Sequence, residues 1–440
     1  MDRTTRRAAL ALSATLALAV PLAAAGSAQA VSTADRPTPS ANATVPDLPD
    51  VPDDLSAMVA DAARDARRDV ATNRALAQSA KIPGAELDAA LDDLVADGAI
   101  AVTARVEKGA RTWSGAAGTR EREGHAPARA RDRFRVASNT KPMIAALVMQ
   151  EVEKGTWTLD TAVEDVLSDV MPAGMTDVTI EQLLSHRSGA PTGTDWILGS
   201  RVTDPSSVDE FFAVMGQEVT PADHIEALRS APWMNEPGAR YSYSNAGFVV
   251  LGMMLEEVTG RSVENLLQYR VFAPAGMWQS AYPDDPGVYG PFLHESAYTG
   301  PEGVGWYDLD HFDPSLFDAA GAVTSTTEDL ADFTEALVTG RLVDTETTAD
   351  MLEPRTVDQA DAPEYGLGVY RVPDPCVAGG WLYGHDGASF GTMSINFTSP
   401  DGERQVSIGI TGRDLVYPVL TDEPLYDPSA LLAGMMQATC

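Results

Sequence analysis

The sequence predicts an α+β fold in which two strand-rich ends of the chain enclose a largely helical middle. Strand-like runs occupy 99–107 and 111–118, and four alternating runs follow residue 365. Between about 150 and 320 the pattern indicates helices and long loops. Strands at both ends with helices between them are typical of an α+β domain with a helical insertion. We therefore expect an antiparallel sheet flanked by helices, plus a largely helical part.

The composition is that of a folded protein with a strongly acidic surface. The 440 residues are 44% hydrophobic, and 64 acidic residues against 31 basic ones give a net charge of -33. Nucleic-acid binding and docking to anionic membranes both need clustered lysine and arginine. The charge therefore excludes these two classes of partner.

The N-terminal residues predict export. Three arginines, at positions 3, 6 and 7, precede an apolar run over 8–26 and a small-x-small site at 28–30. This pattern is typical of a secretory signal peptide. We expect cleavage after residue 30, a secreted protein and no membrane anchor in the mature chain. The arginine pair leaves the Sec and twin-arginine routes both open.

A leader is expected over 31–85, followed by one catalytic domain over 86–440. The leader is rich in Pro, Ser, Thr and Asp at first, and 52–80 looks helical but mostly polar. It either stays a linker or propeptide, or folds onto the body. Within the domain, the α/β part is expected from about 86–150 and 320–440, and the helical part from 151–319. The predicted elements are a helix at 85–96, a hairpin turning at 108–109, strands at 365–372, 381–383, 391–397 and 405–411, and a helix at 427–438.

The two cysteines, Cys376 and Cys440, predict a disulfide. Disulfides persist in exported proteins, and this bridge would close a long loop and stabilise the fold by about 4 kcal/mol. Two free thiols or a thiol catalyst are the alternative, but the chain has no CxxC motif.

The first candidate for chemistry is Ser138-Asn139-Thr140-Lys141. Positions i and i+3 share one face of a helix, so the serine oxygen and the lysine amine can meet. Pro142 is compatible with a helix that begins at about Ser138, because the first helical N–H groups have no intrahelical acceptor. The nucleophile would then lie at a helix N-terminus, which favours developing negative charge.

Two further motifs follow in the chain, Tyr243-Ser244-Asn245 and His385-Asp386-Gly387. From the composition, each motif alone is expected by chance roughly 0.2 to 0.5 times in a chain of this length. All three in this order are expected by chance well under about once in a hundred such chains. The set is therefore much more specific than its parts.

Together, these motifs resemble the active-site motifs of the serine β-lactamase and DD-peptidase superfamily, in particular its class C-like branch. Residues 183–189 resemble the LLxHxSG loop of that branch, and 321–330 resemble its AGGxSTxxDL segment, where Ser325 and Glu328 also predict a capping box. The resemblance covers about 86–440. It implies a β-lactamase/transpeptidase-like fold, with an active site between the sheet and the helical part.

The resemblance also implies a mechanism. Ser138 attacks the carbonyl carbon and forms an acyl-enzyme, while Lys141 and Tyr243 remove and relay its proton. The remaining implied roles are the following: Asn245 orients Lys141 or the substrate, His385 replaces the lysine of many β-lactamases, and the backbone N–H groups of Ser138 and Ala388 hold the oxyanion.

On the substrate, the resemblance favours a D-alanyl-D-alanine carboxypeptidase. Gly387, Ser389 and Arg371 are the candidate substrate-binding residues. Some carboxypeptidases of this type hold the terminal carboxylate with an arginine, but here Tyr370 takes the aligned position and Arg371 comes one residue later. An esterase, a D-aminopeptidase and a β-lactamase therefore remain alternatives, as does a non-catalytic penicillin-binding-like cell-wall module. We expect a small peptide, β-lactam or ester as substrate, and a monomer.

Two rival chemistries are disfavoured. Residues 387–391 match the G-x-S-x-G nucleophile elbow, but that motif needs a strand-to-helix turn and a later histidine, and no histidine follows His385. The six histidines and two cysteines show no HExxH motif or clustered ligand spacing. We therefore expect neither a metal nor a cofactor.

Overall fold

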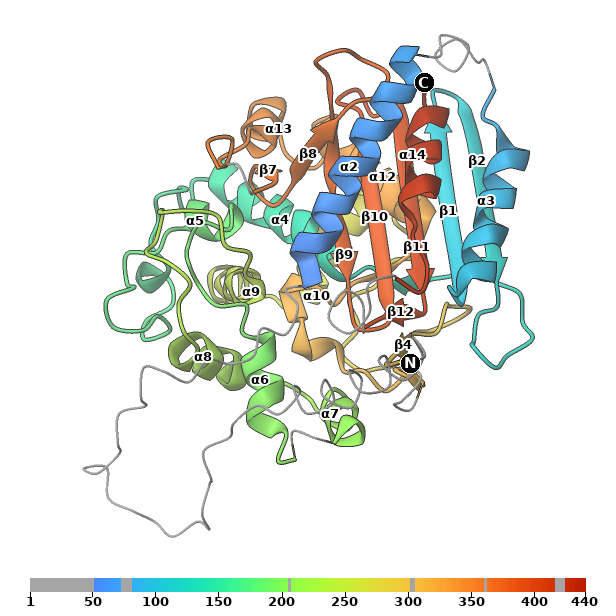
Figure 1. The fold of residues 1–440 in the computed structure, drawn as a ribbon. Helices are drawn as coiled ribbons and strands as arrows, with labels where there is room; N and C mark the ends of the chain where they lie inside the picture. The colour runs from blue at the N-terminus through green and yellow to red at the C-terminus, as the bar shows by residue number, and fades with distance from the viewer. Residues whose placement is uncertain (1–50, 73–80, 205–206, 301–304, 360–361, 416–423) are drawn as a thin grey trace, which may run out of the picture.

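The computed structural model describes residues 51–72, 81–204, 207–300, 305–359, 362–415 and 424–440 (Figure 1). The predicted signal peptide and the first 20 residues of the predicted leader, 31–50, lie outside the described residues. Among the helices of the described part, none is long and apolar enough to cross a membrane.

An antiparallel sheet of seven strands is the centre of the fold, in the order β2-β1-β11-β10-β9-β8-β7. Both ends of the chain contribute to it, because β1 pairs with β11 from Ala101 opposite Thr411 to Lys108 opposite Arg404. Its strands are β1 (Ala101–Lys108), β2 (Arg111–Gly118), β7 (Glu364–Tyr365), β8 (Tyr370–Pro373), β9 (Trp381–Ala388), β10 (Thr392–Thr398) and β11 (Arg404–Thr411).

Within the described residues, five further strands make two small sheets. The strands β12 (Arg413–Asp414), β4 (Ser296–Tyr298) and β5 (Trp306–Asp308) form one of them, in that order. The other pairs β3 (Phe134–Arg135) with β6 (Thr324–Ser325). The strand β3 lies directly before the Ser-x-x-Lys motif and β6 lies within the 321–330 segment, so their pairing holds these two segments together.

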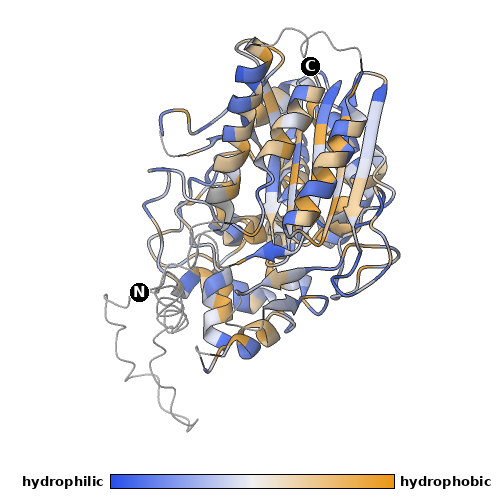
Figure 2. Ribbon diagram, turned by 45° about the vertical axis from the view of Figure 1, so that its right-hand side comes forward, coloured by the Kyte–Doolittle hydropathy of each residue, from blue (hydrophilic) through white to orange (hydrophobic). Residues whose placement is uncertain are grey.

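Three helices cover the outer face of the large sheet: α2 (Val51–Thr72), α3 (Gly84–Asp97) and α14 (Ser429–Ala438). Beneath them, Val59, Leu91 and Leu432 join the buried side chains of β1, β10 and β11 in one apolar core. Figure 2 shows hydrophilic and hydrophobic residues interspersed along the helices, as expected of helices that bury one side only. Of the polar helix expected at 52–80, the described part forms α2, which packs beside α14 and over β8 and β9, and 73–80 lie outside the described residues.

The inner face of the sheet carries the helical part and a second apolar core around α4 and α9. The helices of this side are α4 (Lys141–Glu153), α5 (Ile180–Leu184), α6 (Thr194–Arg201), α7 (Val208–Val214), α8 (Pro221–Ser230), α9 (Asn245–Thr259), α10 (Val263–Leu267), α11 (Ala273–Ala275), α12 (Thr327–Val338) and α13 (Thr345–Leu352). Short turns of helix are η1 (Ala137–Thr140), η2 (Val163–Asp165), η3 (Gln268–Phe272), η4 (Pro314–Leu316) and η5 (Asp318–Ala320).

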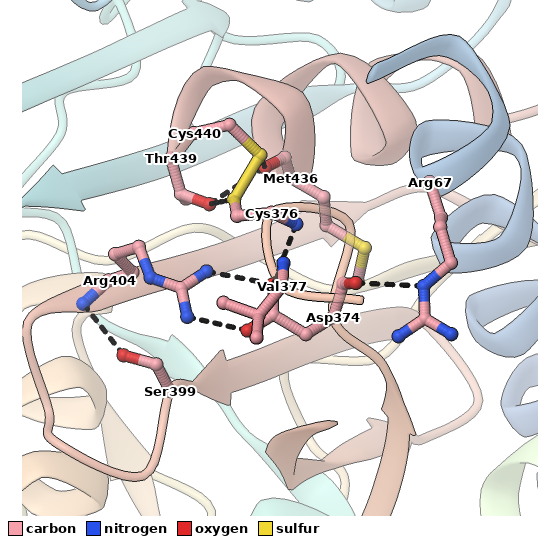
Figure 3. The surroundings of a disulfide bond; sticks show 9 residues. All are labelled: Arg67, Asp374, Cys376, Val377, Ser399, Arg404, Met436, Thr439 and Cys440. Carbon is pink, nitrogen blue, oxygen red and sulfur yellow. Dashed lines mark hydrogen bonds and ion pairs between the residues drawn. A yellow bond between two sulfur atoms is a disulfide. The ribbon is translucent and has the colours of Figure 1, made fainter. Parts of the chain in front are cut away.

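A disulfide fixes α14 to the turn between β8 and β9. Cys376 is bonded to Cys440, with 5.0 Å between their Cα atoms, which confirms the predicted bridge. Figure 3 shows an ion pair next to it, in which Arg404 Nη1 lies 2.8 Å from Oδ1 of the buried Asp374. From α2, Arg67 donates a hydrogen bond to the Asp374 carbonyl oxygen. Covalent, ionic and hydrogen bonds therefore hold α2, α14 and the sheet together at one place.

The predicted α+β class and antiparallel sheet are confirmed, with three local corrections. The strand expected at 365–372 is two strands, β7 and β8, which pair with each other and are separated by 366–369. The strand expected at 381–383 continues to Ala388 and includes the His385 motif. The helix after 321–330 is capped by Thr326, which accepts a hydrogen bond from Asp329 N, so the capping box predicted at Ser325 is one residue early. Two consecutive hydroxyl residues offer the same local signal, and the strand pairing of Ser325 decides between them.

Candidate active site

Ser138 lies at the entrance to α4, within the short helix η1. Before it, Ala137 has a φ of 46°, in the left-handed region that non-glycine residues rarely adopt. This turn directs the chain from β3 into α4. Pro142 occupies the first turn of α4, as the sequence predicted, where its missing N–H removes no helical hydrogen bond.

The Ser138 hydroxyl contacts both groups expected to handle its proton. Lys141 Nζ lies 2.9 Å from Ser138 Oγ, and the Tyr243 hydroxyl donates to the same oxygen at 2.7 Å. The lysine comes from α4 and the tyrosine from the turn before α9, which are packed against each other. The structure thus brings the first two predicted motifs together at one oxygen atom.

The environment of Lys141 suits a base. Its side chain is fully buried, and burial holds the pKa of its amine well below the ordinary 10.5 although the charge of Asp386 acts in the opposite direction. Nζ also lies 2.8 Å from Asn245 Oδ1 and 2.9 Å from the Ala320 carbonyl oxygen. In its neutral form this amine would have two N–H groups for these two oxygens and a lone pair that could accept the Ser138 proton.

Asn245 is itself held in place. Its Nδ2 donates to Thr192 Oγ1 at 3.1 Å and to Thr194 Oγ1 at 3.4 Å, so its Oδ1 is the atom that faces Lys141. Next to it, Ser244 caps α9. The Ser244 N–H donates to Nδ1 of His186, whose ring packs 4.2 Å from that of Tyr243. His186 is therefore a buried support of the tyrosine turn and does not contact the nucleophile.

The third motif brings the edge of β9 close to the nucleophile. A Cβ atom on Gly387 would lie 2.8 Å from the Ser138 nitrogen and closer still to the Val136 carbonyl oxygen. Only glycine permits this approach, which places Ala388 on the strand beside Ser138. The pair of backbone N–H groups expected to hold the oxyanion thus comes from two adjacent segments.

The turn after Ala388 is held in place by hydrogen bonds to a buried carboxylate. Ser389 and Thr392 donate to Oε1 of the buried Glu295, at 3.0 and 2.7 Å. Ser389 is 3% exposed and faces this carboxylate, so the structure assigns it to the brace of the turn and not to the substrate side. Because this turn joins two strands, it also lacks the strand-to-helix geometry of a nucleophile elbow.

His385 lies on β9 among aromatic side chains. Its Nε2 is 2.9 Å from the Tyr365 hydroxyl, and its Nδ1 contacts the Asp386 carbonyl oxygen. Burial, and secondarily the charge of Lys141, lowers the pKa of His385 to about 3, so its imidazole is neutral at physiological pH. His385 therefore brings no positive charge to the site, unlike the lysine that it replaces.

Arg371 is engaged elsewhere. Its Nε lies 2.7 Å from Glu364 Oε2, and its guanidinium carbon lies 4.2 Å above the Trp381 ring. Neighbouring residues of a strand face opposite sides, and Tyr370 instead donates from its hydroxyl to Asp386 Oδ1 at 2.7 Å. The arginine that could have held a substrate carboxylate is thus paired with a glutamate.

Several site residues were not predicted. Thr192, Thr194, Glu295 and Ala320 act through contacts between distant segments, which leave no local signal. Asp386 lies inside a predicted motif, but its role depends on Tyr370. In the described part of the chain, no cluster of three or more His, Cys, Asp or Glu side chains could hold a metal ion.

A buried lysine and a tyrosine both contact one serine hydroxyl, beside two converging backbone segments, and this is the arrangement expected in a serine-type hydrolase. The Beta-lactamase family model matches residues 87–410. The chain therefore belongs to the β-lactamase family, in its class C-like branch.

Among solved structures, the fold is similar to that of a D-stereospecific amidohydrolase from a Streptomyces species, with a TM-score of 0.66 and 28% identity. The match covers 75% of this chain and 94% of that one. A D-amino acid amidase from Ochrobactrum anthropi has the same fold, with a TM-score of 0.64 at 22% identity over 80% of this chain and 97% of that one.

Curated relatives include Penicillin-binding protein 4* of Bacillus subtilis, which is 25% identical over 62% of this chain and 59% of its own length. Esterase EstB of Burkholderia gladioli is 32% identical over 44% of this chain and 50% of its own length. The matched region thus spans about half the length of these relatives.

Proposed function

We propose that this protein hydrolyses a small amide or ester of a D-amino acid through an acyl-enzyme on Ser138. The observation that carries the proposal is the Ser138 hydroxyl, which lies within 2.9 Å of both Lys141 Nζ and the Tyr243 hydroxyl. The similarity to a D-stereospecific amidohydrolase, which extends over most of that chain, supports the substrate class.

The proposed reaction has two halves. The neutral Lys141 amine accepts the proton of Ser138 while Oγ bonds to the substrate carbonyl carbon, and the backbone N–H groups of Ser138 and Ala388 stabilise the oxyanion. The bond to the leaving group then breaks, Tyr243 transfers its proton to the departing nitrogen or oxygen, and the proton that Lys141 took from Ser138 passes to Tyr243, so both groups recover their starting states. Water attacks the acyl-enzyme in the same way and releases the acid.

A DD-carboxypeptidase is the second candidate, and the similarity to penicillin-binding proteins favours it. Against it stands the ion pair of Arg371 with Glu364, which leaves this arginine engaged away from a terminal carboxylate. We further infer export of the protein, from the composition of residues 1–30, and we expect a monomer.

Intact mass spectrometry tests the acyl-enzyme. The wild-type protein and Ser138→Ala are each incubated with an activated ester and, separately, with a penicillin. We expect one acyl group on the wild type after brief exposure to the ester and none on Ser138→Ala. A lasting penicillin adduct would favour the carboxypeptidase, whereas equal labelling of both proteins would refute the role of Ser138.

A further inference from the structure

A buried ion pair connects the two segments that carry the expected oxyanion donors. Arg135 is the last residue of β3, three residues before Ser138, and Glu295 directly precedes β4. Both side chains are almost fully buried, and Arg135 Nε lies 3.9 Å from Glu295 Oε1. Among the described residues, neither of them has another ion-pair partner. Each charge is therefore compensated by the other.

The electrostatics of the pair make it sensitive to the loss of either member. Burial raises the pKa of the Glu295 carboxyl, and the charge of Arg135 acts against that rise by favouring the carboxylate. Glu295 Oε2 and Arg135 Nη1 are buried without a hydrogen-bond partner among the described residues. Removing one charge would thus leave the other buried and uncompensated, which is unfavourable.

Glu295 holds the turn that follows Ala388. Its Oε1 accepts hydrogen bonds from Ser389 at 3.0 Å and from Thr392 at 2.7 Å. A Cβ atom on Gly391 would lie 2.7 Å from Glu295 Cβ, so the backbone of the turn packs directly against the glutamate. The carboxylate therefore fixes the turn on both sides of the glycine, beginning one residue after Ala388.

Arg135 holds the segment that leads to Ser138. Its Nη2 donates to the carbonyl oxygens of Pro286 at 2.7 Å and Phe312 at 3.2 Å. Its guanidinium carbon also lies 5.4 Å from the centre of the Phe312 ring. These contacts and the ion pair fix the guanidinium in one place. Because only two residues separate Arg135 from Ser138, the place of the arginine constrains that of the Ser138 N–H.

A second link between the same segments carries no charge. Ser394 on β10 donates to the Val136 carbonyl oxygen and accepts from Asn139 Nδ2, both at 2.7 Å. This link holds β10 against the nucleophile segment. Ala388 forms the last residue pair between β9 and β10, with Met393, so the direction of its N–H depends on the turn that follows. The link through β10 thus leaves the turn to be positioned by the glutamate.

On these contacts we propose that Glu295 and Arg135 are positioning residues that set the distance between the N–H groups of Ser138 and Ala388. This inference rests on the proposed function, in which these two groups hold the oxyanion. The pair acts through the backbone and does not touch the reacting atoms. Because an oxyanion forms in both acylation and deacylation, loss of the pair should slow both steps by the same factor.

Hydrolysis of p-nitrophenyl acetate by the full chain tests the role of Glu295. Glu295→Gln keeps an oxygen for the two hydroxyl donors and removes the charge partner of Arg135, whereas Glu295→Ala removes both. We expect kcat to fall by about tenfold in the first variant and by about 100-fold in the second, because displaced donors stabilise the oxyanion less. KM should stay within about twofold of the wild type, since both steps slow together. An unchanged kcat in Glu295→Ala would overturn the proposal.

A boronic acid separates oxyanion binding from substrate binding. When phenylboronic acid binds, Ser138 Oγ bonds to boron, the serine proton passes to Lys141, and one boron-bound oxygen takes the place of the oxyanion. In each variant the Kd should rise by the factor by which kcat/KM falls, as expected for a transition-state analogue. An unchanged Kd beside a reduced kcat/KM would refute the positioning role.

Asp374→Asn is the matched control. Asp374 is also a buried carboxylate paired with an arginine, but it lies beside the disulfide, where Arg404 Nη1 is 2.8 Å from its Oδ1 (Figure 3). Asp374→Asn and Glu295→Gln should both lower the free energy of unfolding, because each breaks a buried ion pair. Only Glu295→Gln should lower kcat and the affinity for phenylboronic acid. Equal losses in both variants would contradict the proposal.

Thr392 offers a milder change that tests the same contact if the Glu295 variants do not fold. Thr392→Val removes one donor to Glu295 with little change in volume, whereas Thr392→Ser retains it. We expect kcat to fall by about fivefold in Thr392→Val, the effect of about one hydrogen bond. Thr392→Ser should restore most of that loss. Equal kcat values in these two variants would overturn the proposal.

Acylation of the wild type distinguishes failure of this inference from failure of the proposed function. If p-nitrophenyl acetate acylates Ser138 but the Glu295 variants keep the wild-type kcat and Kd, only the positioning role is refuted. If Ser138 is never acylated, the proposed function fails, and the positioning role fails with it.

Discussion

The outer face of the seven-stranded sheet is covered by α2, α3 and α14 through apolar side chains, whereas the inner face buries the polar groups of the active site. Leu91 and Leu432 are almost fully buried on the outer side, and Lys141 and Asn139 are as deeply buried on the inner side. Burying apolar surface stabilises a fold, but burying an amine requires compensating hydrogen bonds. The apolar cores on both faces therefore stabilise the fold, while the inner face also holds the buried polar groups of the site.

On the inner face, Tyr243→Phe is expected to lower kcat strongly while changing the free energy of unfolding little. The phenylalanine ring keeps the packing on His186 and loses only the hydroxyl that donates to Ser138 Oγ. We expect kcat to fall by about 10²–10⁴-fold, as for loss of a general acid or base. The free energy of unfolding should change by less than about 1.5 kcal/mol, the value of one hydrogen bond. A large loss of stability with little loss of rate would contradict the expected difference between the two faces.

Removal of the disulfide should have the largest effect on the outer side. With a sequence separation of 64 between its cysteines, the bridge is expected to stabilise the fold by about 4 kcal/mol through the unfolded chain. We expect the double variant Cys376→Ser, Cys440→Ser to lose about that much in denaturant unfolding. Reductant should destabilise the wild type and leave the variant unaffected, and sensitivity of the variant to reductant would contradict the assignment.

A cavity on the outer face should lower stability without altering the chemistry. Leu432 on α14 is fully buried in the apolar core. Leu432→Ala should lower the free energy of unfolding by about 3 kcal/mol, within the range for such truncations. At 25 °C kcat/KM should stay unchanged, because α14 does not touch the active site. A matched fall in kcat/KM would show that the two faces are coupled.

The smallest predicted effect is a shift in pH dependence. Lys141 must be neutral to act as base, and burial lowers its pKa, so kcat/KM should rise as the pH rises through that lowered value. Since the unfolded lysine is still protonated up to about pH 10, stability should also rise with pH between the two values. Asp386 raises the pKa of Lys141, so Asp386→Asn should move the acidic limb of the rate profile to lower pH. A shift to higher pH, or an equal shift in Glu364→Gln, would contradict this.

The two faces also differ in how well the sequence predicts them. The Ser138 motif can be predicted from the sequence because its two side chains lie one helical turn apart. The strands can be predicted because their apolar and polar side chains alternate. The packing of α2 cannot be predicted in this way, because this helix is polar on average and the small residues that it buries, such as Ala62 and Ala63, each bury little apolar surface.

Residues whose roles depend on distant partners were beyond local patterns as well. Arg371 is positioned by Glu364 and Trp381, and Asp386 by Tyr370. The sequence gives the types of these residues. The direction of each side chain, however, is determined by ion pairs and aromatic contacts between strands. The nucleophile could thus be predicted, whereas the partners of Arg371 and Asp386 required the structure.

The left-handed backbone at Ala137 has a consequence for how this enzyme can be improved. An alanine at this φ is less stable than a glycine by roughly 1 kcal/mol, because its Cβ approaches its own carbonyl. A screen for thermal tolerance should therefore recover Ala137→Gly, while a screen for turnover should retain alanine, because a more flexible residue would let the Ser138 N–H drift from the oxyanion. At position 137, selection for stability should therefore favour glycine, whereas selection for turnover should favour alanine.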